Sequence, residues 1–222
     1  MLGGERLAPP AEPARRPLEH VLPSVPPLPK GAEQVSPITV ELEVVRKPAD
    51  GEAQRAHHVV TRTVDRIHVA VEGGPEWLFE RNAIDPRRVS GVRVDHEEKV
   101  AIFYSDTDLR NMRGIPGWAH VLTLGLDEQR LAGPVASHDA RTISGLRFTR
   151  MQVRDNEGQG SDVWWNQEHL LAAVSSASGS GGWVQTTIRR VTAIIDRRLL
   201  ESTAVRFPQF RQVDLAEWLE HR

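Results

Sequence analysis

Three runs of sequence decide the fold: TISGLRFTRMQVR at Thr142–Arg154, VWW at Val163–Trp165 and WVQTTIRRVTAII at Trp183–Ile195. β-Branched and aromatic residues dominate these runs, and polar residues separate the first two, so the runs predict strands joined by turns. The segment Phe207–Leu219 closes this part of the chain and ends in a helical pattern.

The first half of the chain has the same character. Apolar and polar side chains alternate from Ile38 to Val44, which is typical of a strand with one face on a core. A longer run at Ala56–Glu72, rich in Val, Thr and Ile, is interpreted as one strand. Three shorter strands follow, the last two as a hairpin: Glu76–Asn82, Val89–Asp95 and Val100–Tyr104.

Short helices are expected between and after the strands. Ser105 and the acidic residues that follow it offer N-cap oxygens for a helix ending at Gly114, and a second helix or turn is expected at Gly117–Leu126. A closing helix is expected at Asp214–His221, whereas the tract Ser175–Gly182 is predicted to be a flexible loop. The fold class is therefore α+β, mainly β: a curved antiparallel sheet with few helices.

Prolines are concentrated at the start of the chain. Nine of the 15 prolines lie in Leu7–Pro37. Because each proline removes a backbone donor and fixes φ, this segment is expected to be an extended arm. Residues Met1–Gln34 are expected to be dispensable for folding. The expected organisation is an arm at residues 1–37 and one β-rich domain at residues 38–222. A docking arm for a proline-recognising partner is the alternative to a plain tether.

Composition narrows the class of function. The net charge is −2, with 28 basic and 30 acidic residues and no block of one sign, so a nucleic-acid partner is not expected. The 222 residues include no cysteine, which excludes disulfides and thiolate chemistry. No apolar run reaches the roughly 20 residues of a membrane helix, and no signal-peptide core follows Met1. We nevertheless expect a periplasmic or otherwise exported protein, with the cytoplasm left open.

Three stretches resemble the periplasmic lipoprotein-carrier superfamily and uncharacterised exported relatives. They are the hairpin Val92–Tyr104 with the helix after it, the pair Gly145–Phe148 and Asp162–Asn166, and the ending from Leu199 to Asp214. The resemblance implies a half-barrel sheet whose concave face is closed by short helices and holds an acylated protein or a lipid-like ligand. No functional position of that superfamily transfers to this chain residue by residue.

Large aromatic side chains in the predicted strands are the first candidates for a ligand site. Trp164 and Trp165 are adjacent, so they must point to opposite sides of a sheet. One should lie in the core and the other on a surface. Core packing and an apolar, indole-lined site both remain open. The candidate ligand-binding aromatics are Trp77, Phe79, Phe103, Trp164 and Trp183.

Arginines are the candidates for holding a head group. Arg62 and Arg66 are expected on one face of the run Ala56–Glu72, with Arg81 near the rim. Their guanidinium groups can clamp a carboxylate or phosphate, or form cross-strand ion pairs.

Histidines offer the best metal suggestion, at His57, His58, His68 and His96. Adjacent strand residues point apart, so hydrogen-bonded or exposed histidines are favoured, and neither a metal nor another cofactor is expected.

No catalytic constellation is evident, since there is no nucleophile elbow and no phosphate loop. The sequence favours a non-enzymatic binding protein for an apolar ligand or an acylated partner, with no nucleic acid involved. A protein-interaction module of a cell-envelope complex, with a membrane-associated partner, is the alternative. A metal- or carboxylate-dependent hydrolase is the third class. The oligomeric state is left open.

Overall fold

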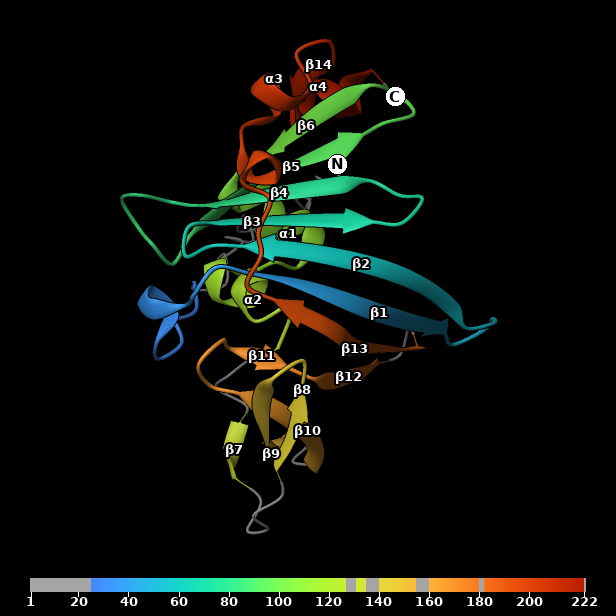
Figure 1. Ribbon diagram of the computed structural model, residues 1–222. Helices are drawn as coiled ribbons and strands as arrows, with labels where there is room; N and C mark the ends of the chain where they lie inside the picture. Colours follow the sequence, from blue (N-terminus) through green and yellow to red (C-terminus); the bar gives the residue numbers. More distant parts are fainter. Residues whose placement is uncertain (1–24, 127–130, 135–139, 155–159, 180–181, 222) are drawn as a thin grey trace, which may run out of the picture.

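The structure is a computed structural model that describes residues 25–126, 131–134, 140–154, 160–179 and 182–221. Most strands belong to one strongly curved, nine-stranded sheet (Figure 1). Its six central strands follow one another as a meander, in which every strand pairs antiparallel with the next: β1 (Ile38–Pro48), β2 (Gln54–Arg62), β3 (Arg66–Val71), β4 (Glu76–Arg81), β5 (Val89–Asp95) and β6 (Val100–Tyr104).

Later strands extend this sheet at both edges. β13 (Gly182–Thr192) pairs antiparallel with β1, and β12 (Val174–Gly179) follows as the edge strand. At the other edge, β14 (Arg211–Asp214) pairs parallel with β6. A second sheet lies below the first in Figure 1 and contains β7 (Leu131–Pro134), β8 (Ala140–Ile143), β9 (Leu146–Arg154), β10 (Gly160–Asn166) and β11 (Leu171–Ala172).

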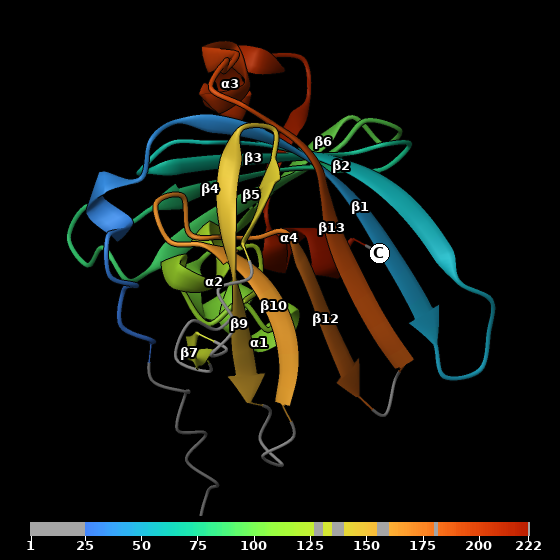
Figure 2. The same ribbon diagram turned by 60° about the horizontal axis from the view of Figure 1, so that its bottom comes forward.

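The helices are short. The sheet arches over α1 (Asp106–Arg113) and α2 (Trp118–Leu122), so these two lie on its concave side (Figure 2). None of the helices within the described part of the chain has the length and apolar character needed to cross a membrane. The other helices of the described residues are α3 (Thr203–Arg206), α4 (Leu215–Glu220) and the 3₁₀ turns η1 (Ala32–Gln34) and η3 (Arg197–Leu200).

Strand register assigns every side chain of the main sheet to a face, because directly paired residues share a face and neighbours in sequence alternate. Val40 pairs with Val60, which pairs with Val69, and this row points to the concave side. Val40 and Val60 are buried there together with Ile67 and the helix residues Leu109, Trp118 and Leu122. A smaller group of buried apolar side chains lies on the convex face under the C-terminal segment: Leu78, Val94, Ala101 and Leu200.

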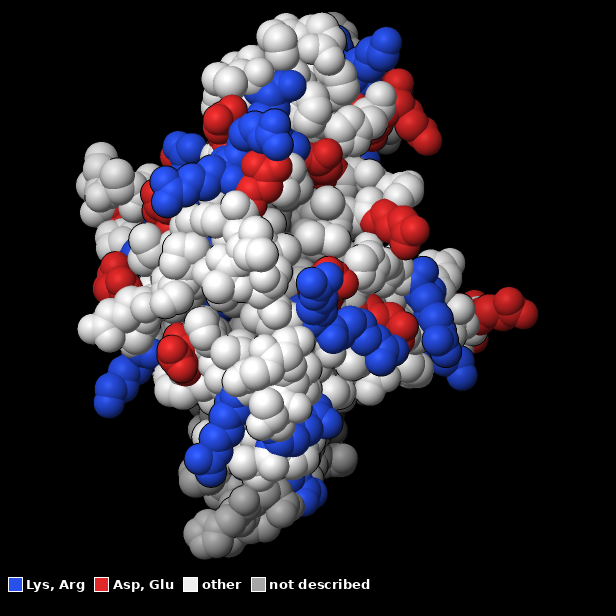
Figure 3. Space-filling view, viewed as in Figure 1, with Lys and Arg blue, Asp and Glu red and all other residues white. Residues whose placement is uncertain are grey.

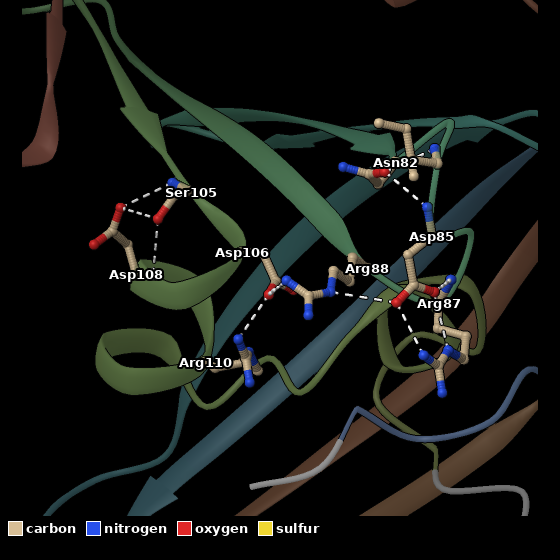
Figure 4. A network of polar contacts seen from close by, with 9 residues as sticks. Asn82, Asp85, Arg87, Arg88, Ser105, Asp106, Asp108 and Arg110 are labelled. Carbon is tan, nitrogen blue, oxygen red and sulfur yellow. Dashed lines mark hydrogen bonds and ion pairs between the residues drawn. The ribbon is translucent and has the colours of Figure 1, made fainter. Parts of the chain in front are cut away.

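α1 and the β4–β5 loop are fixed to each other by polar contacts (Figure 4). Ser105 and Asp108 form a capping box that starts α1. Asp106 pairs with Arg110 at 2.8 Å and with Arg88 at 3.7 Å. Arg88 also pairs with Asp85 at 3.3 Å within the β4–β5 loop. The loop therefore has a defined position against the start of the helix.

The described part of the proline-rich segment, residues 25–37, packs against the domain. Ala32 and Val35 are 1% and 4% exposed and belong to the concave core. Val25, seven residues before Ala32, lies close to Gly117. A Cβ added at Gly117 would come within 2.9 Å of the Val25 side chain and within 2.6 Å of the Arg87 carbonyl oxygen. Residues from Val25 onward thus form part of the folded domain, although the arm was expected to run to residue 37.

Most strand predictions hold, with three differences. The run Thr142–Arg154 is part of two strands, β8 and β9, which pair antiparallel through a turn at Ser144 and Gly145. The run Ala56–Glu72 is two strands, since the backbone N–H of Thr63 donates to the carbonyl of Arg66 in a tight turn, and the Thr63 hydroxyl bonds Asp65. No glycine or proline marks this turn. The tract Ser175–Gly182, predicted to be a loop, contributes β12 and the start of β13. Pairing with β13 overrides the weak strand propensity of its serines and glycines.

Replacing Val35 with Ala tests whether the N-terminal segment contributes to stability. Because the side chain is buried, the substitution should lower the free energy of unfolding by about 2 kcal/mol. The exposed neighbour Gln34, changed to Ala, should have an effect within about 0.5 kcal/mol. Chemical denaturation measures both variants, and equal stabilities would show that the segment does not pack as described.

Candidate functional site

The eight site residues expected from the sequence fall into three places. By register, Trp77, Phe79, Arg62 and Arg81 point to the concave face. Phe103, Trp183 and Arg66 point to the convex face. Trp164 lies on β10 of the second sheet. Arg62 and Arg66 were predicted to share a face, but they lie on opposite faces of the sheet, because the turn after Arg62 starts a new strand.

Each of the three arginines is engaged within the protein. Arg62 is fully buried and donates to the carbonyls of Leu122 and His169. Burial lowers the pKa of its guanidinium to about 9.

The other two arginines have acidic partners. Arg66 donates to Glu80 and to the Leu200 carbonyl, at 2.8 Å each. Arg81 forms a bidentate ion pair with Glu33 and donates to the Pro86 carbonyl at 2.8 Å. These contacts tie the arginines to the structure rather than to a ligand.

The aromatic candidates differ in exposure. Phe79 is 6% exposed. Trp77 is half-buried and stacks on Phe79, with ring centres 5.5 Å apart. Trp164 is half-buried under the Arg141 guanidinium, whose central carbon lies 4.5 Å from the ring centre, whereas its neighbour Trp165 is 3% exposed. The predicted division of this pair into one core and one surface residue is confirmed.

A row of half-buried side chains crosses the concave face beyond the helices. Val44 pairs with Ala56, His58 pairs with Val71, and Val69 pairs with Trp77. All are partly exposed, in contrast to the fully buried rows under the helices. This surface, called the concave strip below, consists of Val44, Ala56, His58, Val69, Val71 and Trp77.

The concave strip carries no charge at neutral pH. Its one titratable side chain is His58, whose pKa is lowered by burial and by the neighbouring charges of His57 and Arg46. The imidazole is therefore neutral at pH 7, and the remaining members are apolar. Such a surface can hold hydrocarbon and cannot bind an ion by itself.

A second cluster, which sequence reasoning missed, lies on the convex face around Glu76. The carboxylate accepts from Arg206 at 2.5 Å and bonds the ring nitrogens of His68 and His96 at 2.7 and 2.9 Å. Burial raises the pKa of Glu76, but the hydrogen bonds from His68 and Arg206 together outweigh burial and hold it at about 2.

The Glu76 cluster fastens the C-terminal segment to the sheet. Arg206 lies on α3, and His96 also contacts the rings of Phe207 and Phe210 at 5.3 and 5.8 Å. Two of its members, His68 and His96, were considered in the sequence only as metal candidates, and their pairing with Glu76 and Arg206 was missed because the four residues come from separate elements. Within the described residues, no group of three or more His, Cys, Asp or Glu side chains is arranged to hold a metal ion.

Charges of both signs are interspersed on the convex side. Figure 3 shows basic and acidic side chains next to one another over this face. Examples are the pairs Arg189 with Glu43 at 2.8 Å and Arg190 with Glu41 at 3.5 Å. The face in view therefore presents no extended surface of one sign.

Comparison with known proteins gives fold-level likenesses. No family model and no curated protein matches the chain. Among solved structures, PNGF-II is 12% identical with a TM-score of 0.42, and the match covers 83% of this chain and 32% of PNGF-II. A LolA superfamily protein from Nitrosomonas europaea is 9% identical, with a TM-score of 0.39 and coverage of 78% and 95%. MucB is 11% identical, with a TM-score of 0.38 and coverage of 78% and 59%.

This chain thus spans about a third of PNGF-II. The weak resemblance to the lipoprotein-carrier superfamily, inferred from the sequence, is also present among the solved structures. At these identities and TM-scores the likenesses carry no argument about function.

Substituting Trp165 and Trp164 separately with Ala tests their division of roles. Loss of the buried Trp165 should lower the free energy of unfolding by about 3–5 kcal/mol. Loss of the half-buried Trp164 should lower it by only about 1–2 kcal/mol, since its ring buries less surface than that of Trp165 and has the Arg141 guanidinium over it. Denaturant titration measures both, and equal losses would contradict the orientation described.

The Glu76 cluster predicts a pH dependence. Because the pKa of Glu76 in the folded protein lies below the ordinary glutamate value of 4.5, the stabilisation by its carboxylate is fully present above pH 4.5 and is lost as the pH falls towards 2. Glu76→Gln should lower the free energy of unfolding by about 2–3 kcal/mol at pH 7. The free energy of unfolding of this variant should also fall less steeply between pH 5 and pH 2 than that of the wild-type protein. Unfolding curves across this range measure the effect. Glu97→Gln, on an exposed turn, is the control. An equally steep loss of stability between pH 5 and pH 2 in Glu76→Gln and in the wild-type protein would contradict the role of the Glu76 carboxylate.

Proposed function

We propose that this is a non-enzymatic, exported binding protein that holds an apolar, lipid-like ligand against the concave strip. The observation that carries the proposal is the strip itself: six side chains from four neighbouring strands, uncharged at neutral pH and only half-buried. Removing such a continuous apolar surface from water stabilises a complex by about 25 cal/mol per Å² of buried area.

The neighbouring structure supports a ligand at this place. α1 and α2 fill the concave face beside the strip, with Leu109 and Leu122 fully buried. A ligand would therefore lie against a rigid, already packed surface and would not require the core to open. Preformed surfaces of this kind bind with a smaller ordering cost than flexible ones.

The second candidate is a protein-interaction module. The side chain of Ile84 is 95% exposed on the β4–β5 loop. The loop backbone is fixed, because the Asn82 side chain accepts from the N–H groups of Ile84 and Asp85 at 2.8 and 2.9 Å (Figure 4). An apolar side chain presented on a preorganised loop is suited to enter a pocket on a partner protein.

Titration with the neutral apolar dye Nile red tests the first proposal. The protein should bind the dye saturably, and Val44→Asp should weaken binding at least about tenfold, because a carboxylate would be desolvated against hydrocarbon. Val45→Asp is the matched control, since Val45 is the next residue on β1, is equally half-buried and points to the convex face.

Melting temperatures of both variants show whether each is folded. Absence of saturable binding, or equal loss in Val44→Asp and Val45→Asp, would reject the concave strip as the ligand site and leave the interaction module as the better candidate.

A further inference from the structure

Arg113 lies at the end of the concave strip. It is the last residue of α1, and its guanidinium carbon is 5.5 Å from the ring centre of Trp77 and 5.3 Å from that of Tyr104. Its Nη2 donates to the Tyr104 hydroxyl at 2.9 Å. The two rings lie 5.2 Å apart, so one guanidinium covers both.

This guanidinium has no acidic partner among the residues that the structure describes. Nearby arginines differ in this respect. Arg110, one turn earlier on α1, pairs with Asp106 at 2.8 Å, and Arg93, the cross-strand partner of Trp77, pairs with Asp95 at 3.0 Å. Arg113 is also exposed. Its positive charge is therefore uncompensated by a local carboxylate and accessible to a ligand.

The position of Arg113 is set by the fold. Gly114 ends α1 with φ of 64°, and its N–H donates to the Leu109 carbonyl, so the helix stops directly after Arg113. A cation in the last turn is favoured by the helix dipole. Stacking then uses the face of the guanidinium, whereas its N–H donors lie in the plane of the group. Only one of those donors is used by Tyr104.

We infer that Arg113 binds the anionic head group of a single-chain amphiphile, such as a fatty-acid carboxylate or a phosphate monoester, whose hydrocarbon chain lies on the concave strip. The inference rests on the proposed function, because the chain is what the strip would hold. Charge complementarity selects the class: Arg113 places a cation with no acidic partner among the described residues in contact with Trp77 of the uncharged strip, which matches a ligand with an apolar chain and an anionic end. Carboxylate and phosphate oxygens both suit the planar fork of an arginine.

Binding of four probes separates the head group from the chain. Dodecanoate, dodecyl phosphate, 1-dodecanol and inorganic phosphate are titrated below their aggregation concentrations, with tryptophan fluorescence and calorimetry as readouts. The wild-type protein should bind the two anionic amphiphiles about tenfold more tightly than 1-dodecanol, and inorganic phosphate far more weakly. The preference should shrink as ionic strength rises.

Variants assign the preference to Arg113. Arg113→Gln should bring the anionic amphiphiles to the affinity of 1-dodecanol and leave 1-dodecanol itself unchanged. Arg113→Lys should retain part of the preference, since it keeps the charge and loses the fork. Arg197→Gln is the control and should behave as wild type, since Arg197 is exposed on η3, whose Leu200 carbonyl accepts from the convex-face residue Arg66. Melting temperatures confirm that every variant is folded.

The outcomes distinguish this inference from the proposed function. Equal binding of alcohol and anions by the wild-type protein, or an anion preference that survives in Arg113→Gln, would overturn the role of Arg113 while the apolar site stands. If inorganic phosphate binds as tightly as dodecyl phosphate, the inference that the ligand is an amphiphile is wrong. Failure of all three chain-bearing probes would overturn the proposed function as well.

Discussion

The buried guanidinium of Arg62 connects the parts of this protein that the concave face depends on. Arg62 ends β2, and its two terminal nitrogens donate to the carbonyl of Leu122 at the end of α2 and to that of His169 between β10 and β11. Thus one side chain joins the main sheet, a helix under its arch and the second sheet. Burial lowers its pKa to about 9, so it remains charged at neutral pH and depends on those two carbonyls for the solvation it has lost.

The arrangement around Arg62 determines where the concave face can accept a ligand. Leu122 and Trp118 are held against the middle of the sheet and are fully buried with Ile67 and Val60. The middle of the arch is therefore filled by the protein itself. The outer parts of β1 to β4 keep half-buried side chains, and six of these form the concave strip. A half-barrel filled in this way offers a narrow apolar surface beside its core instead of an empty interior.

Much of the fold followed from local sequence patterns. Alternation from Ile38 to Val44 predicted β1, Ser105 and Gly114 bounded α1, and Asp214 capped α4, whose Glu217 N–H donates to it at 2.8 Å. These signals are local, so they can be interpreted without tertiary contacts. The aromatic pair Trp164 and Trp165 was divided correctly for the same reason.

The features that could not be predicted from the sequence depend on contacts between distant segments of the chain. The turn at Thr63 carries neither glycine nor proline, and missing it placed Arg66 on the wrong face. Glu76 meets Arg206 across 130 positions, and no spacing rule relates the two. The site arginines were chosen from residue type and strand position, which cannot show that Arg66 and Arg81 have acidic partners while Arg113 has none among the described residues.

The two faces of the sheet are closed by different means, and the difference favours the concave face for binding. On the convex side, the Glu76 cluster and the rings of Phe207 and Phe210 hold the C-terminal segment over Leu78 and Val94. That cover is polar at its centre and fastened by an ionised group at neutral pH. The concave strip has no such fastening among the described residues. A surface that the chain covers with paired charges serves stability, whereas an apolar surface left half-covered beside an unpaired arginine is where binding energy remains to be gained.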